Sequence, residues 1–127
     1  MKEMILAFGC EEIYPLLQRT FAPQRMSVKA VSTADLTQKI AVLAGVAGYE
    51  RTDLCCEEEK ITEPMLVFCG FYGNRMNLAL QAMRRTGLRI PYKAMLTKSN
   101  QDWKPAQLLK ELKAEHEALE QGKRVHD

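Results

Sequence analysis

Short apolar runs alternate with amphipathic stretches along the whole chain. The runs at 4–8 and 65–69 are continuously apolar, which is typical of strands buried on both faces of a sheet. A third strand is predicted over 28–31, where Lys29 weakens the pattern, and a fourth over 92–96, directly after Pro91. The pattern therefore predicts four strands.

Each predicted strand is followed by a stretch in which apolar residues recur at helical spacing. Ser32 or Thr33 suits the N-cap of the second helix, and Gly45 and Gly87 suit the ends of the second and third helices. Pro105 suits the start of a long last helix. The predicted buried faces are Ile13, Leu16, Leu17 and Phe21, then Leu36, Ile40 and Leu43, then Met76, Leu80 and Met83, and finally Leu109, Leu112, His116 and Leu119.

Strands that alternate with helices indicate an α/β fold with a mainly parallel sheet. The chain has 127 residues, which is enough for one domain with a core of its own. We expect residues 1–127 to form a three-layer sandwich whose four-stranded sheet has the order 2-1-3-4, a flavodoxin-like topology. Residues 49–64 are expected to be a polar connector within this domain, and no internal repeat is evident.

Charge is distributed unevenly, although the net charge is only +2. Residues 50–63 contain six acids and two bases, whereas residues 75–104 contain seven bases and one acid. A weak nucleic-acid interface is one interpretation of the basic half, and its candidates are Arg75, Arg84, Arg85, Arg89, Lys93, Lys98 and Lys104, with Tyr72, Tyr92 and Trp103. A basic face more often serves solubility, so a nucleic-acid partner is not expected.

The chain contains no apolar stretch near the roughly 18 residues of a membrane span, and its start lacks an export signal. We therefore expect a cytoplasmic protein without membrane partners. Its four cysteines are expected to be reduced, because disulfides are rare in that compartment.

In parallel α/β sheets, ligands bind beyond the C-terminal ends of the strands. We therefore expect any ligand-binding site to draw on the segments that follow the predicted strands, which would lie along one rim of the sheet. The residues selected from these segments are Cys10, Glu11, Gly70, Phe71, Thr97, Asn100 and Trp103.

None of these segments contains a complete catalytic or cofactor-binding motif. Cys10 precedes two glutamates, which would repel a phosphate, and Leu16 stands where a Cys-x5-Arg loop needs its arginine. A receiver domain would carry an aspartate at the end of the third strand, where this chain has Cys69-Gly70, and the first loop lacks the glycines that bind flavin or dinucleotides. Two thiols, Cys10 and Cys69, do not complete a metal site. We expect no catalytic residue, no cofactor and no metal.

The apolar strand at 64–71 and the segment 93–103, which reads Lys-Ala-Met-Leu-Thr-Lys-Ser-Asn-Gln-Asp-Trp, resemble the bacterial family known as domain of unknown function 3783. The resemblance extends over about residues 28–118 and implies an α/β fold without an assigned activity. It makes Lys93, Thr97, Asn100 and Trp103 signature positions. Thr97 and Asn100 can hydrogen-bond the turn while Trp103 packs beneath it, or the same groups can hold a small anion or a peptide end; we favour the first interpretation.

Two functional hypotheses follow. The favoured one is a non-enzymatic regulatory or interaction domain that binds a protein partner, a second copy of the chain or a small ligand at the C-terminal edge of the sheet. The alternative is a small enzyme that uses thiol or acid–base chemistry near Cys10, Glu11, Glu12 and Cys69. The absence of a complete motif makes the enzyme the less favoured hypothesis.

Overall fold

The computed structural model describes residues 2–52 and 60–126, and it confirms an α/β fold with helices packed on a four-stranded sheet. The strands are β1 (Met4–Phe8), β2 (Val28–Ala30), β3 (Met65–Cys69) and β4 (Tyr92–Met95). Their order in the sheet is β2-β1-β3-β4, as predicted. The four principal helices are α1 (Tyr14–Phe21), α2 (Ile40–Ala44), α3 (Arg75–Thr86) and α4 (Pro105–His126).

The sheet is mostly parallel, but its central pair is antiparallel. β1 is parallel to β2 and β3 is parallel to β4, whereas β1 and β3 run in opposite directions. The flavodoxin-like expectation was therefore right about strand order and wrong about the direction of the two central strands. The end of the connector explains the difference. The carbonyl oxygen of Glu63 lies beside Gly9, at the C-terminal end of β1. Because the chain enters β3 from this edge, β3 starts where β1 ends and runs in the opposite direction.

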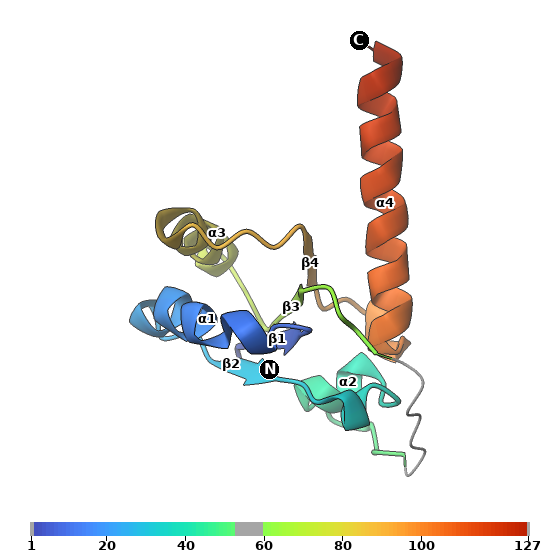
Figure 1. Cartoon of the computed structure of the whole chain (residues 1–127). Helices are drawn as coiled ribbons and strands as arrows, with labels where there is room; N and C mark the ends of the chain where they lie inside the picture. Colours follow the sequence, from blue (N-terminus) through green and yellow to red (C-terminus); the bar gives the residue numbers. More distant parts are fainter. Residues whose placement is uncertain (1, 53–59, 127) are drawn as a thin grey trace.

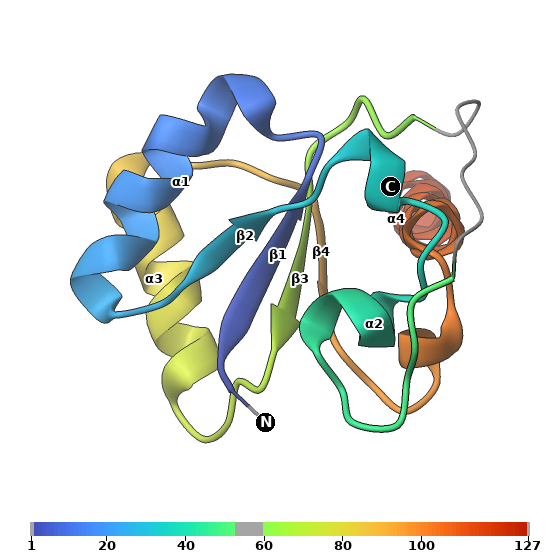
Figure 2. The same ribbon diagram turned by 90° about the horizontal axis from the view of Figure 1, so that it is seen from below.

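The helices form two layers, one on each face of the sheet (Figure 2). Ile5, Ala7 and Phe68 point into a core that α1 and α3 cover. Leu6 and Val67 point to the other face, where α2 and the first turns of α4 cover them. Because both faces are covered, the central strands have no solvent-facing positions, and this is the physical reason for their unbroken apolar runs.

The two halves of the chain share one architecture, which gives the sheet an approximate two-fold axis. Each half contains a strand, a helix, a parallel strand, a short 3-10 helix and a further helix. Leu6 lies opposite Val67 at the middle of the β1–β3 pair, and the register is symmetric about that point. The same hydrogen bond closes the outer strand pair of each half at 2.9 Å, from Val31 N to Ala7 O and from Leu96 N to Phe68 O.

The helix predicted after Ser32 is broken in the structure. Residues Thr33–Asp35 form a 3-10 turn, and α2 begins only at Ile40. The segment between them leaves the helical conformation, and Lys39 is extended, with ψ 149°. The buried side chain of Gln38 exchanges two hydrogen bonds with the Thr52 backbone, at 2.7 and 2.8 Å, so this stretch fastens the connector instead of continuing the helix.

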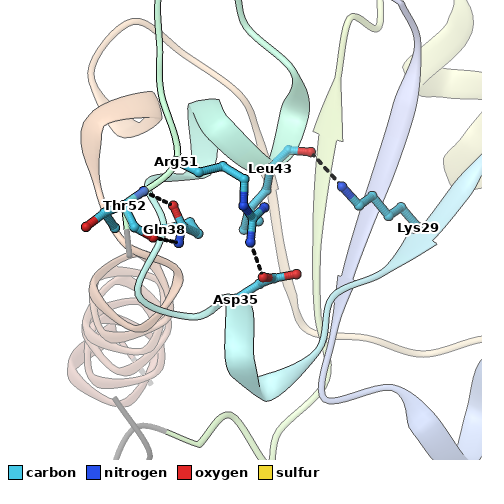
Figure 3. A network of polar contacts seen from close by, with 6 residues as sticks. All are labelled: Lys29, Asp35, Gln38, Leu43, Arg51 and Thr52. Carbon is cyan, nitrogen blue, oxygen red and sulfur yellow. Dashed lines mark hydrogen bonds and ion pairs between the residues drawn. The ribbon is translucent and has the colours of Figure 1, made fainter. Parts of the chain in front are cut away.

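Two further contacts hold the same region together (Figure 3). Arg51 pairs with Asp35 at 2.5 Å, and Lys29 Nζ donates to the carbonyl oxygen of Leu43, at the end of α2, at 3.3 Å. The start of the predicted connector at 49–64 is therefore anchored on the α2 side of the sheet. Residues 53–59 of that connector lie outside the described residues.

Helix α4 extends well beyond the body of the domain (Figure 1). Leu108 and Leu109 are buried against the sheet and Leu112 is half-buried, whereas Leu119 is 68% exposed. The predicted apolar stripe thus continues past the surface that it packs on. Among the described residues, no helix combines the length and the apolar character needed to cross a membrane.

Candidate functional site

The antiparallel centre of the sheet divides the predicted site between two opposite edges. β1 and β2 end at one edge, which carries Cys10 and Glu11 and is called the Cys10 edge below. β3 and β4 end at the other edge, called the Thr97 edge, where Gly70, Phe71 and Thr97 follow the strands. The expectation of a single rim is therefore wrong, because it required β1 and β3 to be parallel.

The Cys10 thiol is buried and hydrogen-bonded to the backbone of its own strand. Cys10 is 4% exposed, and its Sγ donates to the Phe8 carbonyl oxygen at 3.2 Å. Burial raises the pKa of this thiol to about 11, and the charge of Glu11 adds to the rise while hydrogen bonding to the Met65 and Phe8 backbone opposes it. A thiol that stays protonated is a poor nucleophile at neutral pH.

Cys69 lies far from Cys10, on the other face of the sheet. Cys69 pairs with Met4, at the start of β1, whereas Cys10 follows the end of β1, so the length of the strand, about 13 Å, separates them. Burial raises the pKa of the Cys69 thiol to about 12. The two cysteines therefore cannot share a ligand, and within residues 2–52 and 60–126 no group of three or more His, Cys, Asp or Glu side chains could hold a metal ion.

Gly70 and Phe71 serve the packing of the Thr97 edge. Gly70 adopts φ +71°, which turns the chain out of β3, and Phe71 is 4% exposed. The Phe71 ring contacts the ring of Phe68 edge to face, with centroids 5.2 Å apart. Gly70 has no side chain to offer a ligand at this edge, and the buried ring of Phe71 is not presented to one.

Thr97 and Asn100 bind each other across the turn that follows β4. Asn100 Oδ1 accepts from Thr97 N at 2.8 Å, and Thr97 Oγ1 accepts from Asn100 N at 3.0 Å. Asn100 is 7% exposed, and its Nδ2 donates to the Met95 carbonyl oxygen at 2.9 Å. These bonds correspond to the structural interpretation of the two residues, since they satisfy the backbone of the turn itself.

The other two signature positions also contact their own neighbourhood. Trp103 is half-buried against the α2–α4 core, and its carbonyl oxygen accepts from Ile40 N at 2.9 Å, which joins the start of α4 to the start of α2. Lys93 Nζ donates to the Ile90 carbonyl oxygen at 2.5 Å, and partial burial lowers the pKa of this lysine.

A groove opens at the Thr97 edge, between the end of β4 and the loop after α2. Its volume is about 490 Å³, within the range of sites that take small molecules or single peptide segments. Its apolar lining comes from Ala44, Val46, Ala47 and Leu96, and its polar lining from Thr97, Gln101, Lys2 and Lys98. Lys2 and Lys98 are its only charged residues, and neither has an ion pair in the described part of the chain.

A second hollow, also of about 490 Å³, lies at the Cys10 edge and differs in charge. Glu11, Glu12, Thr33 and Lys60 line it, and both carboxylates are exposed. The two carboxylates and Lys60 give this hollow charges of both signs. Of these two hollows, the groove at the Thr97 edge is therefore the one that combines an apolar floor with positive charge, from two lysines without ion pairs in the described part of the chain.

Of the seven predicted site residues, only Thr97 lines the groove at the Thr97 edge and only Glu11 lines the hollow at the Cys10 edge. Sequence reasoning did not select Lys2 or Ala47, and it named Lys98 only for a nucleic-acid interface, because the three residues come from segments far apart in the chain. The sequence signal for this groove is that Thr97 and Lys98 follow the predicted last strand.

Residues 64–119 match the model of a protein family described as a domain of unknown function, DUF3783. This segment contains β3, α3, β4 and the first turns of α4, and it includes the Thr97–Asn100 turn. The resemblance had been expected to begin near residue 28, but the match begins at residue 64, so the first half of the sheet lies outside it. No curated protein and no solved structure is significantly similar to the chain.

Proposed function

We propose that this chain, whose residues 64–119 match the DUF3783 family, is an interaction domain that binds an extended segment of a partner protein in the groove at the Thr97 edge. The segment would carry apolar side chains and carboxylates. The observation that supports the proposal is the lining of the groove, which joins an apolar floor to two unpaired lysines and contains no acid.

The apolar floor accounts for affinity. Val46 and Leu96 are half-buried and Ala47 is exposed, so a leucine-sized side chain placed there would leave water on contact with all three. Full burial of such a side chain contributes about 1.5–3 kcal/mol. One or two anchors of this size support weak, reversible binding, which suits a regulatory contact.

The lysines account for selectivity. Lys2 precedes β1 and Lys98 follows β4, and both line the groove. Carboxylates on a bound segment would meet positive charge at both, whereas a basic segment would be repelled. Charge at the rim of an interface mainly sets partner choice and association rate.

A titration followed by NMR tests the proposal. The full chain, labelled with nitrogen-15, is titrated with an acetylated peptide of alternating leucine and aspartate, and with a second peptide in which lysine replaces aspartate. We expect the acidic peptide to shift the backbone signals of Val46, Ala47, Leu96 and Lys98, and the basic peptide to leave them in place. The substitutions Ala47→Glu and Lys98→Glu should each weaken binding at least about tenfold.

Ala34→Glu is the matched control, because Ala34 is an exposed alanine at the Cys10 edge. It adds the same charge and should leave binding unchanged. Absence of shifts at the groove with the acidic peptide would refute the proposal, as would equal weakening by Ala34→Glu and Ala47→Glu. If the unliganded chain forms a dimer in sedimentation that Ala47→Glu dissociates, a second copy and not another protein occupies the groove.

A further inference from the structure

The last turns of α1 and α3 meet at the end of the molecule that lies away from α4 (Figures 1 and 2). The hydroxyl oxygens of Thr20 and Thr86 are 2.7 Å apart, so one hydroxyl hydrogen-bonds the other between the two helices. This contact joins the two halves of the chain, since α1 belongs to the first and α3 to the second.

Exposed arginines occupy positions close to the contact along the chain. Arg84 and Arg85 directly precede Thr86, Arg19 directly precedes Thr20, and Arg25 and Arg89 follow a few residues further along the chain. We call these five residues the arginine patch. None of them has an ion pair in the described part of the chain. Glu11 and Glu12 precede the opposite end of α1, and the nearer acid Glu3 is already paired with Arg75, which also donates to the Gln24 carbonyl oxygen next to Arg25.

We propose that the arginine patch binds the phosphate backbone of double-stranded nucleic acid. The groove at the Thr97 edge is a separate surface, so this second activity does not depend on the first. Guanidinium groups bind phosphate oxygens in bidentate geometry, and contacts of this kind supply most of the affinity in sequence-independent binding.

The surroundings of the patch favour nucleic acid over an acidic protein. Protein interfaces depend on a desolvated apolar or aromatic centre. The large apolar side chains that are exposed in the described residues are Tyr72, Met95 and Leu119, and none belongs to α1 or to the last turn of α3. A surface with five arginines and no apolar anchor matches a partner recognised by charge alone. The lack of an aromatic platform also favours a duplex over a single strand, whose bases would need stacking partners.

The structural role of the arginines does not explain the whole patch. Cations in the last turn of a helix stabilise it through the helix dipole, and this applies to Arg19, Arg84 and Arg85. The same effect reaches Arg25, which caps the 3-10 helix Ala22–Gln24 after α1, but Arg89 lies three residues past the end of α3 and gains nothing from it. The patch also differs from the basic segment seen in the sequence: Arg75 is paired with Glu3, while Arg19 and Arg25 come from the other half of the chain.

Fluorescence anisotropy with labelled duplexes of about 20 base pairs, one of RNA and one of DNA, tests the proposal over about 50–200 mM salt. We expect wild-type protein to bind at least one duplex with a steep salt dependence. The double substitution Arg84→Ala with Arg85→Ala should weaken binding at least about tenfold and make the log–log salt slope shallower by about 2. Lys104→Ala with Lys110→Ala removes the same charge from exposed positions at α4, and should change affinity no more than about twofold.

Thermal unfolding of both double variants confirms that they remain folded. Binding to either duplex, lost only in the arginine variant, supports the proposal. Three results would overturn it: no binding of wild type at the lowest salt, equal weakening in the two double variants, or competition by polyglutamate as effective as competition by unlabelled duplex. The last result would assign the patch to acidic proteins, and tighter binding to a single strand than to a duplex would equally count against it.

Discussion

Replacement of Gly9 by alanine tests how closely the connector approaches the end of β1. Gly9 has φ +64°, a conformation that costs an L-residue about 1 kcal/mol relative to glycine. A Cβ atom at this position would also lie 2.8 Å from the carbonyl oxygen of Glu63 and 3.0 Å from that of Ile61. Both contacts are with backbone, so the connector would have to move before the alanine could fit.

The two effects can be separated by a matched variant. Gly87 has φ +77° at the end of α3, and a Cβ added there would meet nothing within 4 Å. Gly87→Ala should therefore cost only the backbone term, about 1 kcal/mol. Gly9→Ala should cost that term plus about 1–3 kcal/mol for the enforced shift, or about 2–4 kcal/mol in total. The difference between the two variants measures the close approach alone.

Urea denaturation, followed by circular dichroism, gives both free energies of unfolding. We expect the midpoint of Gly9→Ala to fall clearly below that of Gly87→Ala, with similar slopes. A domain of this length should still fold in either case, because small domains are stable by about 5–15 kcal/mol. Equal losses in the two variants would refute the reasoning, since they would mean that residues 61–63 give way at no cost.

Three other changes test separate features of the structure. Asn100→Ala should cost about 1–3 kcal/mol in urea denaturation, because it leaves the Thr97 amide and the partly buried Met95 carbonyl oxygen without their partner. A loss below about 0.5 kcal/mol, less than an ordinary hydrogen bond contributes, would contradict the structural role of the turn. Arg25→Gly should raise the free energy of unfolding by about 0.5 kcal/mol, because Arg25 has φ +58° at the position that corresponds to Gly87 at the end of α3. A decrease would show that this conformation carries no strain. The raised pKa values of Cys10 and Cys69 mean that the folded state holds these protons more tightly than the unfolded state. The thiols should therefore contribute their full free energy of folding below about pH 9, and this contribution should fall as the pH rises toward 11. The loss should reach up to about 1.4 kcal/mol per pH unit for each thiol. Urea titrations of wild type and of Cys69→Ala across this range check it, and the same alkaline slope in both proteins would argue against the burial of that thiol.

The helix ends show how the two halves reach one geometry with different residues. After α3, Leu88 N donates to Met83 O and Gly87 adopts the left-handed conformation. After α1 and its 3-10 extension, Met26 N donates to Phe21 O in the same way, but Arg25 takes the place of glycine. A search for similar residues does not detect this correspondence. The sequence analysis found no repeat, because the two halves share backbone hydrogen bonds and strand register but not residue identities.

The extent of the helices was harder to predict than that of the strands. Leu36, Ile40 and Leu43 have helical spacing and all three are buried, yet the chain between the first two is not helical. Gln38 is the cause, because its amide satisfies the backbone of Thr52, a residue 14 positions away. Periodicity reports which side chains are buried, but a long-range side-chain bond can override the helix that periodicity favours.

Local patterns sufficed for the central strands and the helical layers, whereas the strand order, which the structure confirms, came from the flavodoxin-like topology. Met4–Phe8 and Met65–Cys69 were found at their true bounds, because burial on both faces leaves an unbroken apolar run that needs no knowledge of neighbours. The direction of β3 relative to β1 had no such signature. A strand has the same side-chain pattern whichever way it runs, so its direction depends on which edge the preceding connector reaches. The direction of β3 is visible only in the folded chain. It places Cys10 and Thr97 at opposite edges of the sheet, and Lys2, Ala47 and Lys98 line one groove.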